Sequence, residues 1–257
     1  MISKLVRAFL NDRFFTTTEA SQIFRNESTR KSTLKQLTKS GQIVHVRKGL
    51  YEVVSPEQVG KKPVADKFLL ARKVASPYCL VYHSALEIQG FANSALYNVV
   101  YVASPNQFRN FEYEGVKYRW VPRKNLDGKE KTVWSTAQIV VSDRERTILD
   151  CLDRTDLAGG FEEVFKSLSS MANVNLDRLL HYAKEERKKA LFHKLGLFLS
   201  FKRLRESWNI TDESLKLIKR NISPRIYYFE TSRGKGKLVR EWNIIVPKKM
   251  EEMMSFA

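Results

Sequence analysis

Residues 42–54 read QIVHVRKGLYEVV, and this stretch decides how the first part of the chain folds. Its alternating apolar residues suit two half-buried strands, and Gly49 supplies the positive φ that a tight reversal needs. The pattern therefore predicts a β-hairpin. Arg47 and Lys48 stand at its turn, where two cations either guard an edge strand against aggregation or contact a polyanion.

Three helices are expected before the hairpin. Apolar residues recur at helical spacing over residues 2–11, which predicts the first helix. One of the threonines Thr16–Thr18 can cap a second helix, which runs over about residues 18–24. A third is expected between Ser28 as its cap and Gly41 as its end. Three helices followed by a two-stranded hairpin are typical of a winged helix-turn-helix.

The third helix has a face without acids. With Leu34 and Leu37 pointing inward, the opposite face carries hydroxyl, amide and ammonium groups. Solvated faces usually mix Glu with Lys, so this face is expected to enter the major groove of DNA, with the hairpin tip along the neighbouring backbone or minor groove. Arg30 either reaches a phosphate or folds against the core, and His45 is either a further contact or a surface residue. The candidate DNA-binding residues are Ser28, Thr29, Arg30, Lys31, Ser32, Lys35, Gln36, Lys39, Arg47 and Lys48.

Charge favours a polyanionic partner. The chain has 257 residues, 45 Lys plus Arg and 28 Asp plus Glu, so its net charge is +17. Nucleic acid heads the possible partners, although an acidic membrane surface or acidic protein would also satisfy this charge. The sequence shows neither a signal peptide nor an apolar run long enough to span a membrane, so a soluble, cytoplasmic protein is expected. Cys79 and Cys151 have apolar neighbours and are expected to be reduced packing residues.

The polar segment Ser55–Pro63, SPEQVGKKP, marks the expected boundary between two domains, residues 1–60 and 61–257. The second domain mixes helices and strands, so the expected fold class is α+β. Its last part, residues 181–257, has 18 bases and 9 acids, a local charge of +9.

Several elements of the second domain can be placed. A helix is expected near residues 66–75, and residues 78–90 combine a short apolar stretch with a helical pattern. Another helix is expected from 142 to 153, with Ser142 as cap and its charges outward, followed by further helices. A closing β-hairpin is expected over residues 225–247. It contains RGKGK, residues 233–237, which lacks the phosphate-loop spacing and is read as a solvated basic turn or as a polyanion contact. The expected strands are 98–103, 113–121 and 134–141.

Nothing in the sequence establishes an enzyme. The four histidines have no metal-ligand spacing, so we expect no metal site, no cofactor and no catalytic residue. Glu114 and Lys117 have the spacing of an acid and a lysine in some nucleases, but no partner carboxylate stands upstream. The charges from Asp143 to Asp153 have the spacing of ordinary helical ion pairs.

Four segments together resemble the AbiEi family, the antitoxins and transcriptional autorepressors of type IV toxin-antitoxin systems. They are VRKGLY, YHSALEIQGF, VSDRERTILDCLDRTDLAGGFEEV and HKLGLFLS, and the resemblance covers about residues 5–250. The most specific piece is SDRERTILDCLDR followed by AGG.

The resemblance implies a division of labour. The winged helix is expected to bind inverted repeats in its own promoter through the residues named above. The larger domain is expected to counteract a nucleotidyltransferase toxin without a lasting complex, and no individual residues can be assigned to that role. Two other readings stay open: a nuclease delivered by its winged helix, and an interaction module whose basic end binds RNA or an acidic partner.

Overall fold

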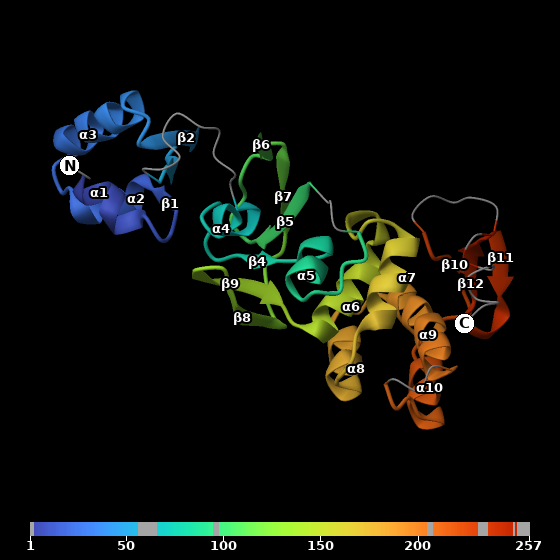
Figure 1. Cartoon of the computed structure of the whole chain (residues 1–257). Coiled ribbons are helices and arrows are strands. Elements are labelled where there is room, and N and C mark those ends of the chain that lie inside the picture. The colour runs from blue at the N-terminus through green and yellow to red at the C-terminus, as the bar shows by residue number, and fades with distance from the viewer. Residues whose placement is uncertain are drawn as a thin grey trace. The chain divides into compact units, whose positions relative to one another are not determined.

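The computed structural model describes residues 3–55, 66–94, 98–204, 208–230, 236–248 and 250 (Figure 1). The chain forms two compact units. Unit 1 comprises Met1–Leu80, Asn98–Leu126 and Lys131–Val140, and unit 2 comprises Val81–Tyr97, Asp127–Glu130 and Val141–Ala257. The domain boundary expected at Ser55–Pro63 falls, from residue 56 onward, outside the described residues.

The three helices expected at the start of unit 1 are present. They are α1 (Lys4–Phe9), α2 (Thr17–Ile23) and α3 (Glu27–Lys39). Thr16 caps α2, and Glu19 completes a capping box. The cap of α3 is Asn26, whose Oδ1 accepts a hydrogen bond from the Thr29 N–H at 3.1 Å, so the expected cap at Ser28 was wrong. An amide side chain two residues earlier takes that role.

The hairpin is also present, as β2 (Ile43–Arg47) and β3 (Leu50–Val53). A strand that the sequence did not predict, β1 (Phe14–Thr16), pairs with β3 to complete a sheet of order β1-β3-β2. The helices and this sheet enclose one core (Figure 1), whose buried residues are Leu5, Val6, Phe15, Ala20, Leu34, Leu37, Ile43 and Val53.

A second sheet has the order β6-β7-β5-β4-β9-β8. Its strands are β4 (Cys79–Leu80), β5 (Val99–Ser104), β6 (Phe111–Tyr113), β7 (Val116–Pro122), β8 (Lys129–Trp134) and β9 (Ala137–Ser142), with the short helix α4 (Lys67–Ala71) before them. The expected strand over residues 113–121 is a hairpin, because Glu114 and Gly115 both have positive φ and reverse the chain. Residues 129–134 form a strand that the sequence did not predict.

Unit 2 is mainly helical. Its helices are α5 (His83–Ile88), α6 (Arg144–Asp153), α7 (Phe161–Ser170), α8 (Leu176–Glu185), α9 (Lys189–Leu204) and α10 (Asp212–Lys219). Their apolar faces share one core, in which Leu149, Leu168, Leu195 and Ile218 are almost fully buried. Asp143, and not the expected Ser142, caps α6 by accepting a hydrogen bond from the Arg146 N–H at 2.8 Å.

A small sheet follows, with the order β10-β12-β11. Strand β10 (Tyr227–Tyr228) runs parallel to β12 (Ile244–Pro247), and β11 (Gly236–Val239) runs antiparallel to it. The expected closing hairpin was therefore wrong in its pairing, because the outer strands both pair with β12. Residues 233–235 of the RGKGK segment lie outside the described residues, whereas Gly236 begins β11.

The α+β class expected from the sequence is confirmed. Both cysteines are buried, as expected. Within the ranges given above, no helix has the length and apolarity that a membrane crossing would require.

Candidate nucleic-acid interface

Helix α3 presents a polar face to solvent. Leu34 and Leu37 are 6% and 5% exposed and hold the helix against the core. The other side carries seven of the ten candidate residues, all exposed: Ser28, Thr29, Lys31, Ser32, Lys35, Gln36 and Lys39. The face combines amide and hydroxyl groups, which can read base edges, with ammonium groups, which can neutralise phosphates.

Two cations at the beginning of α3 have partners within the helix region. The Lys31 ammonium lies 2.7 Å from the Glu27 carboxylate, and both side chains are largely exposed. Such an exposed pair is weak and can be exchanged for a phosphate contact. Arg30 donates from Nη1 to the Phe24 carbonyl oxygen at 3.4 Å, so it folds toward the core, which was one of the two positions expected for it.

The two cations of the hairpin tip have different surroundings. Lys48 is exposed, and Gly49 beside it has a φ of +78°. The Arg47 guanidinium instead lies over the ring of Phe111, 4.8 Å from its centroid, and 5.8 Å from that of Phe108. Both distances are within the range of a cation–π interaction. Burial lowers the pKa of Arg47, and its Nη1 makes no hydrogen bond within the described part of the chain.

The hairpin is held to the six-stranded sheet by a second contact within unit 1. The fully buried Glu52 of β3 accepts hydrogen bonds from Arg13 at 3.0 Å and from the Tyr113 hydroxyl at 2.6 Å. Burial raises the pKa of the Glu52 carboxyl, although these two donors oppose the shift. Tyr113 and Phe111 belong to the same strand, β6, so Arg47 of β2 and Glu52 of β3 both attach the hairpin to that strand.

Within unit 1, ion pairs join α2 and the residues before β1 to the residues that follow α4. Lys73 contacts Glu19, the capping-box residue, and Arg72 lies 2.8 Å from Asp12. These pairs involve none of the residues of the exposed face of α3.

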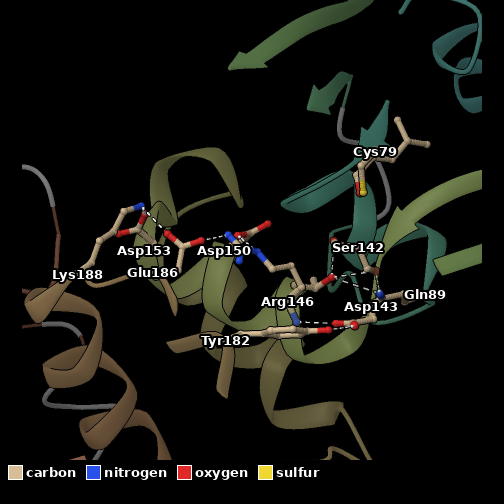
Figure 2. Close-up of polar contacts among 12 residues, drawn as sticks. Cys79, Gln89, Ser142, Asp143, Arg146, Asp150, Asp153, Tyr182, Glu186 and Lys188 are labelled. Carbon is tan, nitrogen blue, oxygen red and sulfur yellow. Dashed lines mark hydrogen bonds and ion pairs between the residues drawn. The ribbon is translucent and has the colours of Figure 1, made fainter. Parts of the chain in front are cut away.

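A second polar cluster, around α6, is drawn in Figure 2. The Tyr182 hydroxyl donates to Asp143 Oδ2 at 2.9 Å, and Arg146 Nε donates to Asp150 Oδ1 at 3.0 Å. Arg146 also contacts Glu186, whose second oxygen lies 3.5 Å from the Lys188 ammonium. Every charge in this set faces an opposite charge or a hydrogen-bond donor.

The expectation that the charges of α6 point outward was wrong. Glu145, Arg146 and Asp150 are only 4%, 8% and 4% exposed, because α8 and the residues after it pack over this side of α6. The Arg146–Asp150 pair has the i, i+4 spacing expected of an ordinary helical ion pair. The cluster joins α6 to α8, and removing one partner would leave a buried charge uncompensated.

A third polar group surrounds Glu163 on α7. Its carboxylate accepts hydrogen bonds from the backbone N–H groups of Asn93 and Ser94, at 2.8 and 3.0 Å, and lies 3.3 Å from His83 Nε2. These donors outweigh the effect of burial and lower the pKa of Glu163. The group ties the segment after α5 to α7, and the exposed Ser94 places its hydroxyl 3.4 Å from His83 Nε2.

The nuclease candidates Glu114 and Lys117 belong to the β6–β7 hairpin. Lys117 lies opposite Glu112 in the β6–β7 hairpin, and Glu114 stands in the turn. Among the residues that the structure describes, no group of three or more His, Cys, Asp and Glu could hold a metal ion.

No model of a known protein family matches the chain, and no curated protein matches it. Among solved structures, the RV2827C protein from Mycobacterium tuberculosis matches 95% of this chain and 90% of its own, with a TM-score of 0.66. Its sequence identity is 15%, so this likeness shows the fold alone.

Proposed function

We propose that residues 3–54 form a winged helix-turn-helix that binds duplex DNA, and that the protein is a transcriptional repressor of its own promoter. The observation that carries this proposal is the exposed polar face of α3, where Glu27 of the first turn pairs with Lys31, beside a hairpin with an exposed Lys48 at its tip. In this arrangement α3 lies in the major groove, Gln36 contacts a base edge, and Lys35 and Lys39 contact phosphates.

Lys48 is the tip residue that we assign to the neighbouring phosphates, because its side chain is exposed. The sequence-based role of Arg47 as a second phosphate contact stays a prediction, and it would require the guanidinium to leave the rings of Phe108 and Phe111.

The first experiment is an electrophoretic shift of the protein on its own upstream DNA and on random duplex of equal length, at about 0.15 M salt. A shift on upstream DNA that resists competitor is expected. Equal shifts on both duplexes would contradict the repressor and leave a non-specific polyanion binder.

Two variants then distinguish contacts to the phosphates from contacts to the bases. Lys48→Ala should weaken binding to all duplexes alike, whereas Gln36→Ala should reduce discrimination between operator and random DNA by about 1–3 kcal/mol if it makes a bidentate base contact. Lys216→Ala on α10 and Gln138→Ala on β9 are the matched controls, since both side chains are exposed outside the proposed interface. Equal losses on operator and random DNA for both test variants would exclude the assignment.

Antitoxin activity is the second part of the proposal, and the sequence resemblance alone supports it. We assign it to residues 61–257 as a whole, against a nucleotidyltransferase toxin and without a stable complex. Co-expression with a nucleotidyltransferase encoded beside this gene should restore growth, and Lys48→Ala should retain that rescue while losing repression. Failure of the wild-type protein to restore growth would exclude the antitoxin role and leave the repressor.

A further inference from the structure

The loop between β5 and β6, residues 105–110, lies beside the tip of the β2–β3 hairpin. Its Phe108 is 6% exposed, and the Arg47 guanidinium lies 5.8 Å from the centroid of that ring. The same guanidinium lies 4.8 Å from the ring centroid of Phe111, the first residue of β6. Arg47 directly precedes the exposed Lys48, so the loop and the hairpin tip are neighbours within unit 1.

Hydrogen bonds hold this loop in place. The Asn106 side chain donates to the Ser76 carbonyl oxygen at 2.6 Å, and the Asn106 N–H donates to Ser104 Oγ at 3.0 Å. At the other end of the loop, Asn110 Oδ1 accepts from the Trp120 N–H at 2.8 Å. The loop is therefore fixed at both ends to the rest of unit 1.

Arg109 is the cation of this loop. It stands between the buried Phe108 and Asn110, and its own side chain is exposed. Within the described ranges, neither Arg109 nor Lys48 takes part in a hydrogen bond or an ion pair through its side chain. The folding of unit 1 therefore does not account for either charge. An arginine on a fixed loop presents a planar set of donors that matches the oxygens of a phosphate.

The contacts of the hairpin define the direction in which β6 runs. Phe111 contacts Arg47, the last residue of β2 before the turn, and Tyr113 contacts Glu52, two residues into β3. The strand therefore leads away from the tip as the residue number rises. Residues before Phe111 lie toward the tip, and residues after Tyr113 lie away from it.

The two acids next to this loop in sequence are placed where they do not oppose an anion at the tip. Glu114 follows Tyr113 and lies at the end of β6 that is farther from the tip. Glu112 alternates with Phe111 and Tyr113, whose side chains contact the hairpin, so its own side chain belongs to the opposite face of the strand. There it stands opposite Lys117 of β7.

We propose that Arg109 contacts a phosphate of the bound duplex, next to the phosphate that Lys48 contacts. The inference rests on the proposed DNA binding and extends that interface beyond the winged helix, onto the second sheet of unit 1. A phosphate contact carries no sequence information, so Arg109 should add affinity for every duplex alike.

The test measures fluorescence anisotropy of the full chain on labelled upstream duplex, over a series of salt concentrations. Arg109→Ala should reduce the slope of log K against log salt by about 1, so its disadvantage against the wild type should shrink about fourfold between about 0.05 and 0.2 M salt. Arg109→Lys keeps the charge and should keep the slope. Lys131→Ala is the matched control, because it removes one exposed charge from β8, at the opposite edge of the sheet from β6.

A hydroxyl-radical footprint locates the contact. Arg109→Ala and Lys48→Ala should each lose protection at neighbouring sugars, whereas the protection that α3 gives should remain in both. Because Arg109 is exposed, Arg109→Ala should keep the melting temperature of the wild type, which a thermal scan checks. Arg109→Gln is a second neutral variant and should have the same reduced slope.

The possible results separate this inference from the proposed function. An unchanged slope in Arg109→Ala beside a reduced slope in Lys48→Ala would overturn the inference and leave the winged helix as the interface. Equal effects of Arg109→Ala and Lys131→Ala would also overturn it, since net charge alone would then explain the change. Equal binding of upstream and random duplex, with the reduced slope in Arg109→Ala, would contradict the repressor and support the phosphate contact. No binding of any duplex by the wild type would overturn both.

Discussion

At the scale of single residues, the hydrogen-bond partners of His193 determine which protonation state its ring adopts. Its Nδ1–H donates to the Trp242 carbonyl oxygen at 2.7 Å, and its Nε2 accepts from the Ser223 N–H at 3.1 Å. A neutral imidazole supplies this donor and this acceptor, whereas the charged ring has two donors. Burial lowers the pKa of His193 below its ordinary value, although the backbone hydrogen bonds oppose that shift.

The sign of the resulting pH dependence follows. The unfolded chain binds the proton more readily than the folded one, so the free energy of unfolding should fall as the pH drops below about 6.5. Urea unfolding at about pH 7.5 and about pH 5.5 measures this effect. Between the two pH values, the free energy of unfolding should fall less for His193→Gln than for the wild type. His181→Gln, at an exposed position, should behave like the wild type. If the free energy of unfolding falls equally in His193→Gln and the wild type, another group controls the loss of stability at low pH.

At the scale of elements, α9 and the residues near β12 pack around one tryptophan. The Trp242 indole N–H donates to Ser200 Oγ at 2.9 Å, and a Cβ added at Gly196 would overlap the indole ring. His193, Gly196 and Ser200 recur three and four residues apart, so they share the side of α9 that receives Trp242. The HKLGLFLS segment of the sequence thus has a packing role.

This contact reverses the usual effect of replacing a helical glycine. Gly→Ala in an exposed helix stabilises by about 1 kcal/mol, but Gly196→Ala should destabilise by about 1–3 kcal/mol because the core is overfilled. Denaturant unfolding measures the difference. Combining it with Trp242→Leu should cost less than the sum of the two single changes. Strict additivity would place the strain elsewhere.

The elements that could be predicted from the sequence are those fixed by near neighbours. Thr16 and Glu19 contact each other within one turn, so the beginning of α2 could be predicted from the sequence. Gly49 likewise allowed the turn of the hairpin to be predicted. The three-residue β1 is too short to show alternation. The parallel pairing of β10 with β12 depends on residues 17 apart, Tyr227 and Ile244, and the charges of α6 are buried only because α8 covers them.

The same limit applies to the candidate site. The exposed face of α3 follows from the positions of Leu34 and Leu37, and it was predicted correctly. The aromatic partners of Arg47 are 61 and 64 residues away in the sequence, at Phe108 and Phe111, so no local pattern could reveal them. The sequence predicted a contact site at the hairpin turn, but it could not show which of the two cations there has an exposed side chain.

At the scale of the whole molecule, the net charge of +17 should make the proposed binding to duplex DNA sensitive to salt. Each phosphate contact releases counterions, so Lys35→Ala and Lys48→Ala should each reduce the slope of log K against log salt by about 1. Fluorescence anisotropy over a series of salt concentrations measures that slope. Lys216→Ala should leave it unchanged, and Arg47→Ala tests directly whether Arg47 contacts a phosphate. Unchanged slopes for both Lys variants would move the interface away from α3 and the hairpin.

The attachment of the hairpin to β6 has a consequence for the affinity of the proposed DNA binding. With Arg47 on Phe111 and Glu52 on Tyr113, the hairpin is ordered before any partner arrives, and only the Lys48 side chain remains to be immobilised. A preorganised loop loses little conformational entropy on association. Loosening this attachment, for example with Tyr113→Phe, would therefore raise the entropic cost of binding although residue 113 lies outside the proposed DNA contacts.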